Sequence, residues 1–235
     1  MKLNAMTFNT QHCLNYMERK IDFEIMARAI LDCDADIVGL NEMRDIGHHS
    51  EFTAQVEKLA ELTGMKYFYF AQAIEVSGKG PYGNALLSRL PIIQAETISI
   101  PDPKPKRYSG YYETRCVLRA RLEGGVTVLV SHFGLNPDEQ EHAVKTVMGQ
   151  ICDEKCILMG DFNVLPDAAV LAPIRERMYD TAQCFDGVKL SFPSDAPRRK
   201  IDYIFVSRDV KVLAADIPPI VASDHRPHTA TLCLE

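Results

Sequence analysis

The sequence predicts an α/β fold in which two mixed β-sheets pack together and helices cover the outer faces. Two observations support this prediction. The first part of the chain alternates strand and helix patterns, as βαβ units do, and the later part contains neighbouring strand patterns joined by short turns. The 235 residues are ample for a hydrophobic core, and we expect a single domain over residues 1–235.

Three segments carry the signals of helices. Residues 21–31 place apolar side chains three and four positions apart, which is the helical period. Residues 50–64 place Phe52 and three further apolar residues on one helix face and end on Gly64, a favourable C-terminal cap. Residues 137–151 begin with proline and acidic residues, which favour the first turn of a helix.

Strand patterns account for most of the remaining chain. Alternating or continuous apolar runs bounded by turn residues predict strands over residues 2–8, 36–42, 66–74, 83–88, 92–100, 115–122, 126–133, 156–159, 201–207, 211–217 and 228–234. Gly124 and Gly125 separate two of them and predict a hairpin.

Composition limits the class of protein and its surroundings. Hydrophobic residues make up 46% and charged residues 25% of the chain, as in ordinary soluble proteins. No apolar run is long enough to span a membrane, and the N-terminus lacks the pattern of a secretory signal. Seven cysteines without a paired CxxC motif suit a reducing compartment, so we expect a cytoplasmic protein. The net charge of −6 provides no general attraction for nucleic acid, although a locally basic groove stays compatible with it.

Polar residues recur where the predicted strands end. One polar residue at a strand end usually caps a turn or faces solvent. Here, however, acids, histidines and carboxamides all lie at the ends of apolar strands, which a sheet would bring to one rim. The set comprises Asn9, Glu42, His132, Asp161, Asn163, Asp202, Asp224 and His225. Its chemistry suits metal-assisted hydrolysis of a phosphate ester, and the oxygen ligands of Glu42 and Asn9 suit Mg²⁺ or Mn²⁺ rather than Zn²⁺.

Seven motifs carry a family resemblance. In chain order they read TFN, LNE, GNALLSR, SHFGL, GDFN, IDYIF and SDHRP, and they span residues 7–227. Together they resemble the endonuclease/exonuclease/phosphatase superfamily. The resemblance implies a four-layer α/β sandwich, with two packed mixed β-sheets flanked by helices. It also implies an Mg²⁺- or Mn²⁺-dependent phosphoric ester hydrolase.

The resemblance assigns roles to the residues of these motifs. Glu42 and Asn9 would bind the divalent metal, and Asp224 would lie beside it. Asp161 and Asn163 would orient the attacking water and hold the phosphoryl group. Asp202 would pair with His225, the favoured general base, while Asp161 is the alternative base. His132 would bond a phosphate oxygen or assist the leaving group.

Two further residues have competing interpretations. Asn84 would contact the substrate phosphate, or would instead belong to a turn at a strand edge after Gly83. Arg115 would bind phosphate through two N–H donors, or would instead pair with Glu113.

Three functions compete at this point. The favoured one is a hydrolase of phosphate esters, either phosphodiesters or phosphomonoesters. It would act on a small or medium phosphorylated substrate by direct attack of a metal- and histidine-activated water. The alternative is an endo- or exodeoxyribonuclease of the same superfamily, although Gln11 stands where abasic-site endonucleases carry an aspartate. The third is a non-catalytic protein that binds phosphorylated ligands on this scaffold, which the intact set of polar residues argues against. No protein partner is predicted.

Overall fold

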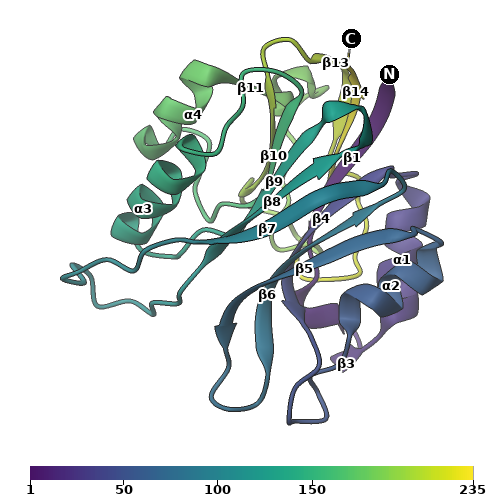
Figure 1. Ribbon diagram of the computed structural model, residues 1–235, viewed down its shortest axis with the longest axis vertical. Helices are drawn as coiled ribbons and strands as arrows, with labels where there is room; N and C mark the ends of the chain where they lie inside the picture. The colour runs from purple at the N-terminus through teal and green to yellow at the C-terminus, as the bar shows by residue number, and fades with distance from the viewer. Residues whose placement is uncertain (235) are drawn as a thin grey trace.

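Two six-stranded sheets pack face to face between two layers of helices, as Figure 1 shows. The computed structural model describes residues 1–234. The first sheet has the order β13 (Lys211–Asp216), β14 (His228–Cys233), β1 (Lys2–Asn9), β4 (Ile37–Arg44), β6 (Pro81–Ser88) and β5 (Tyr67–Glu75). The second has the order β11 (Met178–Asp180), β12 (Asp202–Ser207), β10 (Cys156–Asp161), β9 (Thr127–Ser131), β8 (Cys116–Leu122) and β7 (Ile92–Ser99).

Each sheet is mixed in the same way. One central pair is parallel, β1 with β4 in the first sheet and β9 with β10 in the second. The other neighbouring strands run antiparallel. The short strands β2 (Leu14–Asn15) and β3 (Lys20–Ile21) form a separate hairpin. The four-layer α/β sandwich predicted from the sequence is therefore confirmed.

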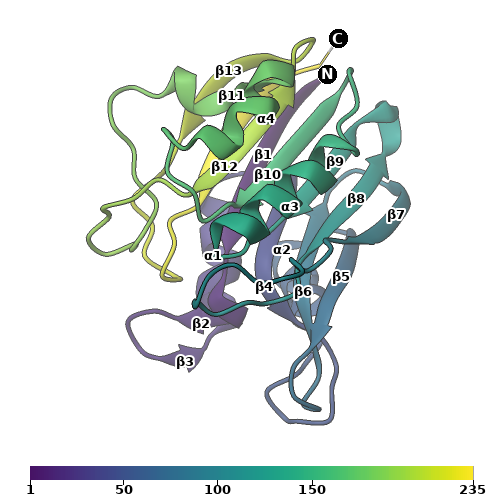
Figure 2. The ribbon, with the colours of Figure 1, turned by 90° about the vertical axis from the view of Figure 1, so that its left-hand side faces the viewer.

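The helices form the two outer layers, one on each side of the paired sheets (Figures 1 and 2). The helices α1 (Phe23–Asp32) and α2 (Gln55–Thr63) cover the first sheet, and α3 (Pro137–Met148) and α4 (Ala172–Arg177) cover the second. Both faces of the central strands are buried, which explains their continuous apolar sequences. In β10, for example, Ile157 and Met159 join the core between the sheets, whereas Cys156 and Leu158 join the core under α3 and α4.

The helix boundaries differ from the predicted ones for local reasons. The helix predicted to begin at residue 21 begins after Asp22, whose carboxylate accepts the N–H of Ile25 and caps the first turn. The prediction that Phe52 lies on a helix face is wrong, because α2 begins only at Gln55. Phe52 is instead buried in the preceding loop, where the guanidinium of Arg44 lies 4.8 Å from its ring centroid.

The cysteines are distributed through the cores and edges of the fold. All seven are free thiols. Cys156 is fully buried under α3, and Cys152 packs against the same cluster. Within residues 1–234, no helix is both long and apolar enough to cross a membrane.

Gly160, which precedes Asp161 in β10, lies too close to β9 for a larger side chain. Its φ is +148°, and a Cβ built on it would lie 1.7 Å from the carbonyl oxygen of Ser131 on β9. We expect Gly160→Ala to lower the free energy of unfolding by about 3 kcal/mol or more. Urea denaturation measures this loss. Gly149→Ala is the matched control, since Gly149 has φ −72° and its nearest neighbour would be 3.4 Å away. A loss at residue 160 no larger than at residue 149 would contradict the steric argument.

Candidate active site

The polar strand ends meet at one edge of the sandwich. Asn9 ends β1, Asp161 ends β10, and Asp202 begins β12, directly opposite Asp161 in the antiparallel register. His132 follows β9, and His225 lies in the segment that leads into β14. Residues from both sheets therefore converge, because strands that run to the same edge deliver their terminal side chains there.

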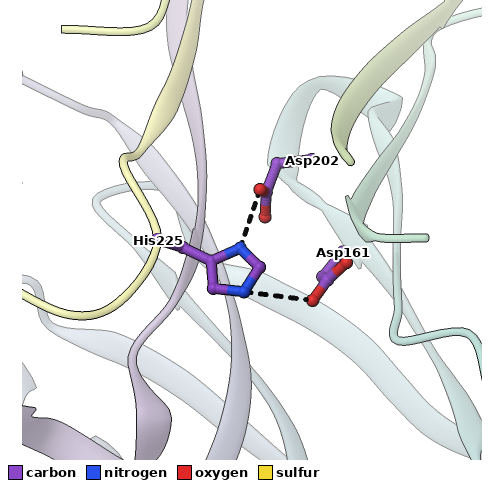
Figure 3. A group of neighbouring side chains, drawn as sticks. All are labelled: Asp161, Asp202 and His225. Carbon is purple, nitrogen blue, oxygen red and sulfur yellow. Dashed lines mark hydrogen bonds and ion pairs between the residues drawn. The ribbon is translucent and has the colours of Figure 1, made fainter. Parts of the chain in front are cut away.

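His225 lies between two aspartates, as Figure 3 shows. Its Nδ1 lies 2.8 Å from Oδ2 of Asp202, and its Nε2 lies 3.6 Å from Oδ2 of Asp161. The ring of Phe192 packs on the imidazole with centroids 4.8 Å apart. A carboxylate only accepts hydrogen bonds, so Nδ1 of His225 donates, and Nε2 is the nitrogen that faces the site.

His132 lies near the same oxygen of Asp161. Its Nε2 lies 3.5 Å from Oδ2 of Asp161 and 3.1 Å from Nδ2 of Asn163. Its Nδ1 accepts a hydrogen bond of 2.9 Å from Nη1 of Arg115. Arginine has donors only, so this contact favours a proton of neutral His132 on Nε2, whereas the amide nitrogen of Asn163 is also a donor and favours a lone pair on Nε2. The pairing of Arg115 with Glu113 allowed by the sequence is also present, with 2.6 Å between Nη1 and Oε1.

Asn9 bridges the two carboxylates of the site. Its Nδ2 donates to Oε1 of Glu42 and to Oδ2 of Asp161, both at 3.1 Å. Glu42 has a left-handed backbone, with φ +63°, at a break in the β4–β6 register between Leu40 and Met43. This bulge allows Glu42 to join Asn9 within a strand whose other side chains alternate between the two faces.

The amide of Asn84 is fully engaged within the protein. Its Oδ1 accepts from Nδ2 of Asn41 at 2.8 Å, and its Nδ2 donates to the carbonyl of Cys116 at 3.0 Å. Asn41 also donates to the carbonyl of Ser131 and accepts the N–H of Asp161 at 2.9 Å. Asn84 therefore holds Asn41, and Asn41 fixes the end of β10 where Asp161 emerges.

Asp224 lies at the margin of this group. Its Oδ1 accepts a hydrogen bond of 3.0 Å from Oγ of Ser223, and its carbonyl accepts the N–H of Ser194. Its charge also acts on both Glu42 and His225. The structure thus brings every predicted catalytic and metal-binding residue into one neighbourhood.

Sequence reasoning gave no role to several residues that the structure adds. Asn41 and Tyr82 lie next to residues of the motifs, and this position in the sequence is the one feature that could have indicated a role for them. Tyr82 is partly buried, and the pKa of its phenol is raised well above 10 by burial and then by the charge of Glu42. Phe192 and Gln55 had no such signal, because their contacts come from distant segments.

Comparison with known proteins identifies the family. The sequence model of the endonuclease/exonuclease/phosphatase family matches residues 6–225. The chain belongs to this family. No curated protein matches its sequence.

Solved structures of family proteins share the fold. The family protein from Bacteroides vulgatus is 20% identical, with a TM-score of 0.78 and 100% of both chains covered. The one from Beutenbergia cavernae is 21% identical, with a TM-score of 0.78, covering 99% of this chain and 72% of the other. The mannosyl-6-phosphatase of Bacteroides thetaiotaomicron is 17% identical, with a TM-score of 0.77, covering 99% of this chain and 100% of the other.

Members of the endonuclease/exonuclease/phosphatase family are divalent-metal-dependent hydrolases of phosphate esters. Here the donor set fits a hard cation at Glu42. One of its oxygens bonds Asn9, while Oε2 accepts no hydrogen bond from residues 1–234, and Asp224 adds a second carboxylate nearby. Asn9 fits less directly, because its Oδ1 accepts the N–H of Gln11 and its Nδ2 faces the carboxylates.

Besides Glu42, a group of three residues at this site has the spacing of metal ligands. One ligating atom from each of Asp161, Asp202 and His225 lies within 4.8 Å of the others (Figure 3). Asp202 and His225 already bond each other at 2.8 Å, however. The group therefore suits the holding of a water and its proton better than the enclosure of a cation.

Burial and charge set the proton affinities of the site. Burial raises the pKa of Asp161 to about 7, although His225 opposes this shift. Burial would lower the pKa of His225, but Asp202, Asp161 and Asp224 together raise it to about 10. Burial also lowers the pKa of His132 well below 6.5, and Arg115 adds to that effect. Without metal, His225 therefore carries a proton at neutral pH, whereas His132 does not.

The raised pKa of Asp161 predicts a specific pH dependence of stability in chelator. An acid with a folded pKa near 7 and an ordinary unfolded value near 3.9 destabilises the fold progressively as pH rises between these values. We expect the stability difference between Asp161→Asn and the wild type to shift in favour of the variant from pH 4 to pH 7 and then level off. Thermal unfolding over this range measures it. A difference independent of pH would show that Asp161 titrates normally.

Proposed function

We propose that this protein is an Mg²⁺- or Mn²⁺-dependent hydrolase of phosphate esters that acts on a small or medium phosphorylated substrate. The observation that carries the proposal is that Nε2 of His132 and Nε2 of His225 both lie within 3.6 Å of Oδ2 of Asp161, while Nδ1 of His225 bonds Asp202. This arrangement offers a carboxylate and two imidazoles to one water and one phosphoryl group. We propose that residues 1–235 act together as one catalytic unit.

Each side chain contributes a distinct step. Oδ2 of Asp161 and Nε2 of His225 would orient the attacking water, and His225 would take its proton while Asp202 fixes the tautomer. His132 would hydrogen-bond a phosphate oxygen or assist the leaving group through Nε2. A divalent cation at Glu42 would supply charge for the phosphate oxygens and lower the pKa values of His225 and Asp161.

Access and charge favour a small substrate. His132, Asp161 and His225 are each at most 4% exposed, so a substrate must present its phosphate at the bottom of the site. The net charge of −6 gives a polyanion little general attraction. The structural neighbour named as a mannosyl-6-phosphatase also supports a small phosphorylated substrate.

All seven cysteines are free thiols, in keeping with the proposed cytoplasmic location.

A substrate panel tests this function. Phosphate or nitrophenol release would be measured for mannose 6-phosphate, p-nitrophenyl phosphate and bis-p-nitrophenyl phosphate, each with Mg²⁺ or Mn²⁺. Cleavage of single- and double-stranded DNA would be measured in parallel. We expect at least one small ester to be hydrolysed with a higher kcat/KM than either DNA. Faster cleavage of DNA than of every small ester would support the nuclease instead, and no turnover of any substrate would support a binding protein.

A further inference from the structure

An unusual backbone segment begins two residues after Asn9. The three consecutive residues Gln11, His12 and Cys13 have φ values of +47°, +49° and +62°. None is glycine, and the left-handed conformation costs free energy for every L-residue with a Cβ. A run of three such residues therefore needs contacts from the surrounding structure to hold it.

This left-handed turn sets the orientation of Asn9. The backbone N–H of Gln11 donates to Oδ1 of Asn9 at 3.0 Å. With Oδ1 occupied, the amide directs Nδ2 to Oε1 of Glu42 and Oδ2 of Asp161. The conformation of the turn thus determines how Asn9 spaces the two carboxylates.

One buried amide links this turn to β4. Gln55, the first residue of α2, has no exposed surface. Its Nε2 donates to the carbonyl of His12 at 2.9 Å, and its Oε1 accepts the N–H of Arg44 at 2.9 Å. Arg44 lies two residues beyond Glu42, which itself has a left-handed backbone. The β1–β4 ladder and the bond from the N–H of Thr10 to the carbonyl of Asn41 already join the two strands. Gln55 adds a link from the left-handed turn to β4 just beyond Glu42.

We propose that Gln55 is a positioning residue that sets the affinity of the site for its divalent cation. It acts through two paths, one from His12 through Gln11 to Asn9 and the other from Arg44 along β4 to Glu42. The inference rests on the proposed function, in which Glu42 holds the cation. Residues that orient metal ligands typically change metal affinity by about 10–100-fold when they are replaced.

The test is a calorimetric titration with Mn²⁺, without substrate. Gln55→Met keeps an unbranched buried side chain and removes both hydrogen bonds. We expect its Kd for Mn²⁺ to rise by about 10–100-fold. We also expect kcat measured at saturating metal to fall by a smaller factor, and faster hydrogen exchange at the amides of residues 11–13. Gln55→Ala is a second variant, which removes both hydrogen bonds and leaves space for water at the carbonyl of His12 and the N–H of Arg44. It should weaken Mn²⁺ binding in the same direction.

Ser88→Ala is the matched control. Ser88 is also fully buried, and its Oγ donates to the carbonyl of Leu90 and accepts the N–H of Leu90. It pairs with Ile37 at the start of β4, the opposite end of the strand from Glu42. We expect this variant to lose stability and to keep the wild-type Kd for Mn²⁺.

Glu42→Gln distinguishes a failure of the positioning role of Gln55 from a failure of the metal assignment to Glu42. If Glu42→Gln weakens Mn²⁺ binding while Gln55→Met behaves like Ser88→Ala, the positioning role of Gln55 is overturned and the proposed function stands. If Glu42→Gln leaves the Kd unchanged, the metal assignment fails, and the inference fails with it. Should Gln55→Met not fold, an unchanged Kd for Gln55→Ala overturns the positioning role.

Discussion

Replacing His225 by alanine is expected to lower kcat by about 10²–10⁴-fold at saturating divalent metal, the usual contribution of a positioned acid–base group. The imidazole is the only group that contacts both Asp202 and the site-facing oxygen of Asp161 in the described structure. Its removal takes away the proton acceptor and leaves Glu42 in place. Steady-state kinetics combined with Mn²⁺ titration would measure both effects, and metal affinity should be largely retained.

Asp202 should share this effect rather than add to it. Asp202→Asn is expected to lose as much activity as His225→Ala or less, because Asp202 acts by orienting the imidazole. The double variant should be little slower than His225→Ala alone, since the two residues act as a unit. Fully additive losses would mean that they act separately. Asp161, with its pKa of about 7, would then be the better candidate for the general base.

Replacing Glu42 by glutamine is expected to weaken divalent metal binding and to reduce turnover at low metal concentration. The substitution keeps the shape of the side chain and removes the charge that attracts a hard cation. Asn9 would still find an acceptor in the glutamine carbonyl, so the fold of the site should survive. Calorimetric titration with Mg²⁺ and Mn²⁺ measures the affinity, and circular dichroism controls for folding.

Two further measurements test whether Glu42 binds the metal: the choice of cation and the affinity of Glu42→Gln. Oxygen donors around Glu42 should favour Mg²⁺ or Mn²⁺, and Zn²⁺ should not support faster turnover than either. Unchanged affinity for both cations in Glu42→Gln would place the metal elsewhere. The group formed by Asp161, Asp202 and His225 would then be the next candidate.

Much of the architecture and the location of the site follow from local sequence. Strand periodicity and the polar residues that end the strands predicted both sheets and one shared rim, because a side chain at a strand end is placed by the strand itself. Asp161 and Asp202 illustrate this, since the antiparallel register sets them opposite each other.

The supporting contacts could not be predicted in this way. Asn41 bonds partners on β6, β9 and β10, so its role depends on how the two sheets pack. The left-handed turn after Asn9 contains no glycine that would predict it from the sequence. The bond of Gln55 to this turn is a tertiary contact between distant segments. The spacing of Phe52 matches the helical period and predicts a helix, whereas burial against Gly80 and Arg44 keeps Phe52 in a loop.

The most direct test of the central claim is hydrolysis of the best small ester by protein stripped of metal with excess chelator. The account predicts no turnover above background in chelator, and recovery of the full rate when Mg²⁺ or Mn²⁺ is restored. Full activity in excess chelator would contradict a metal-dependent mechanism at this site.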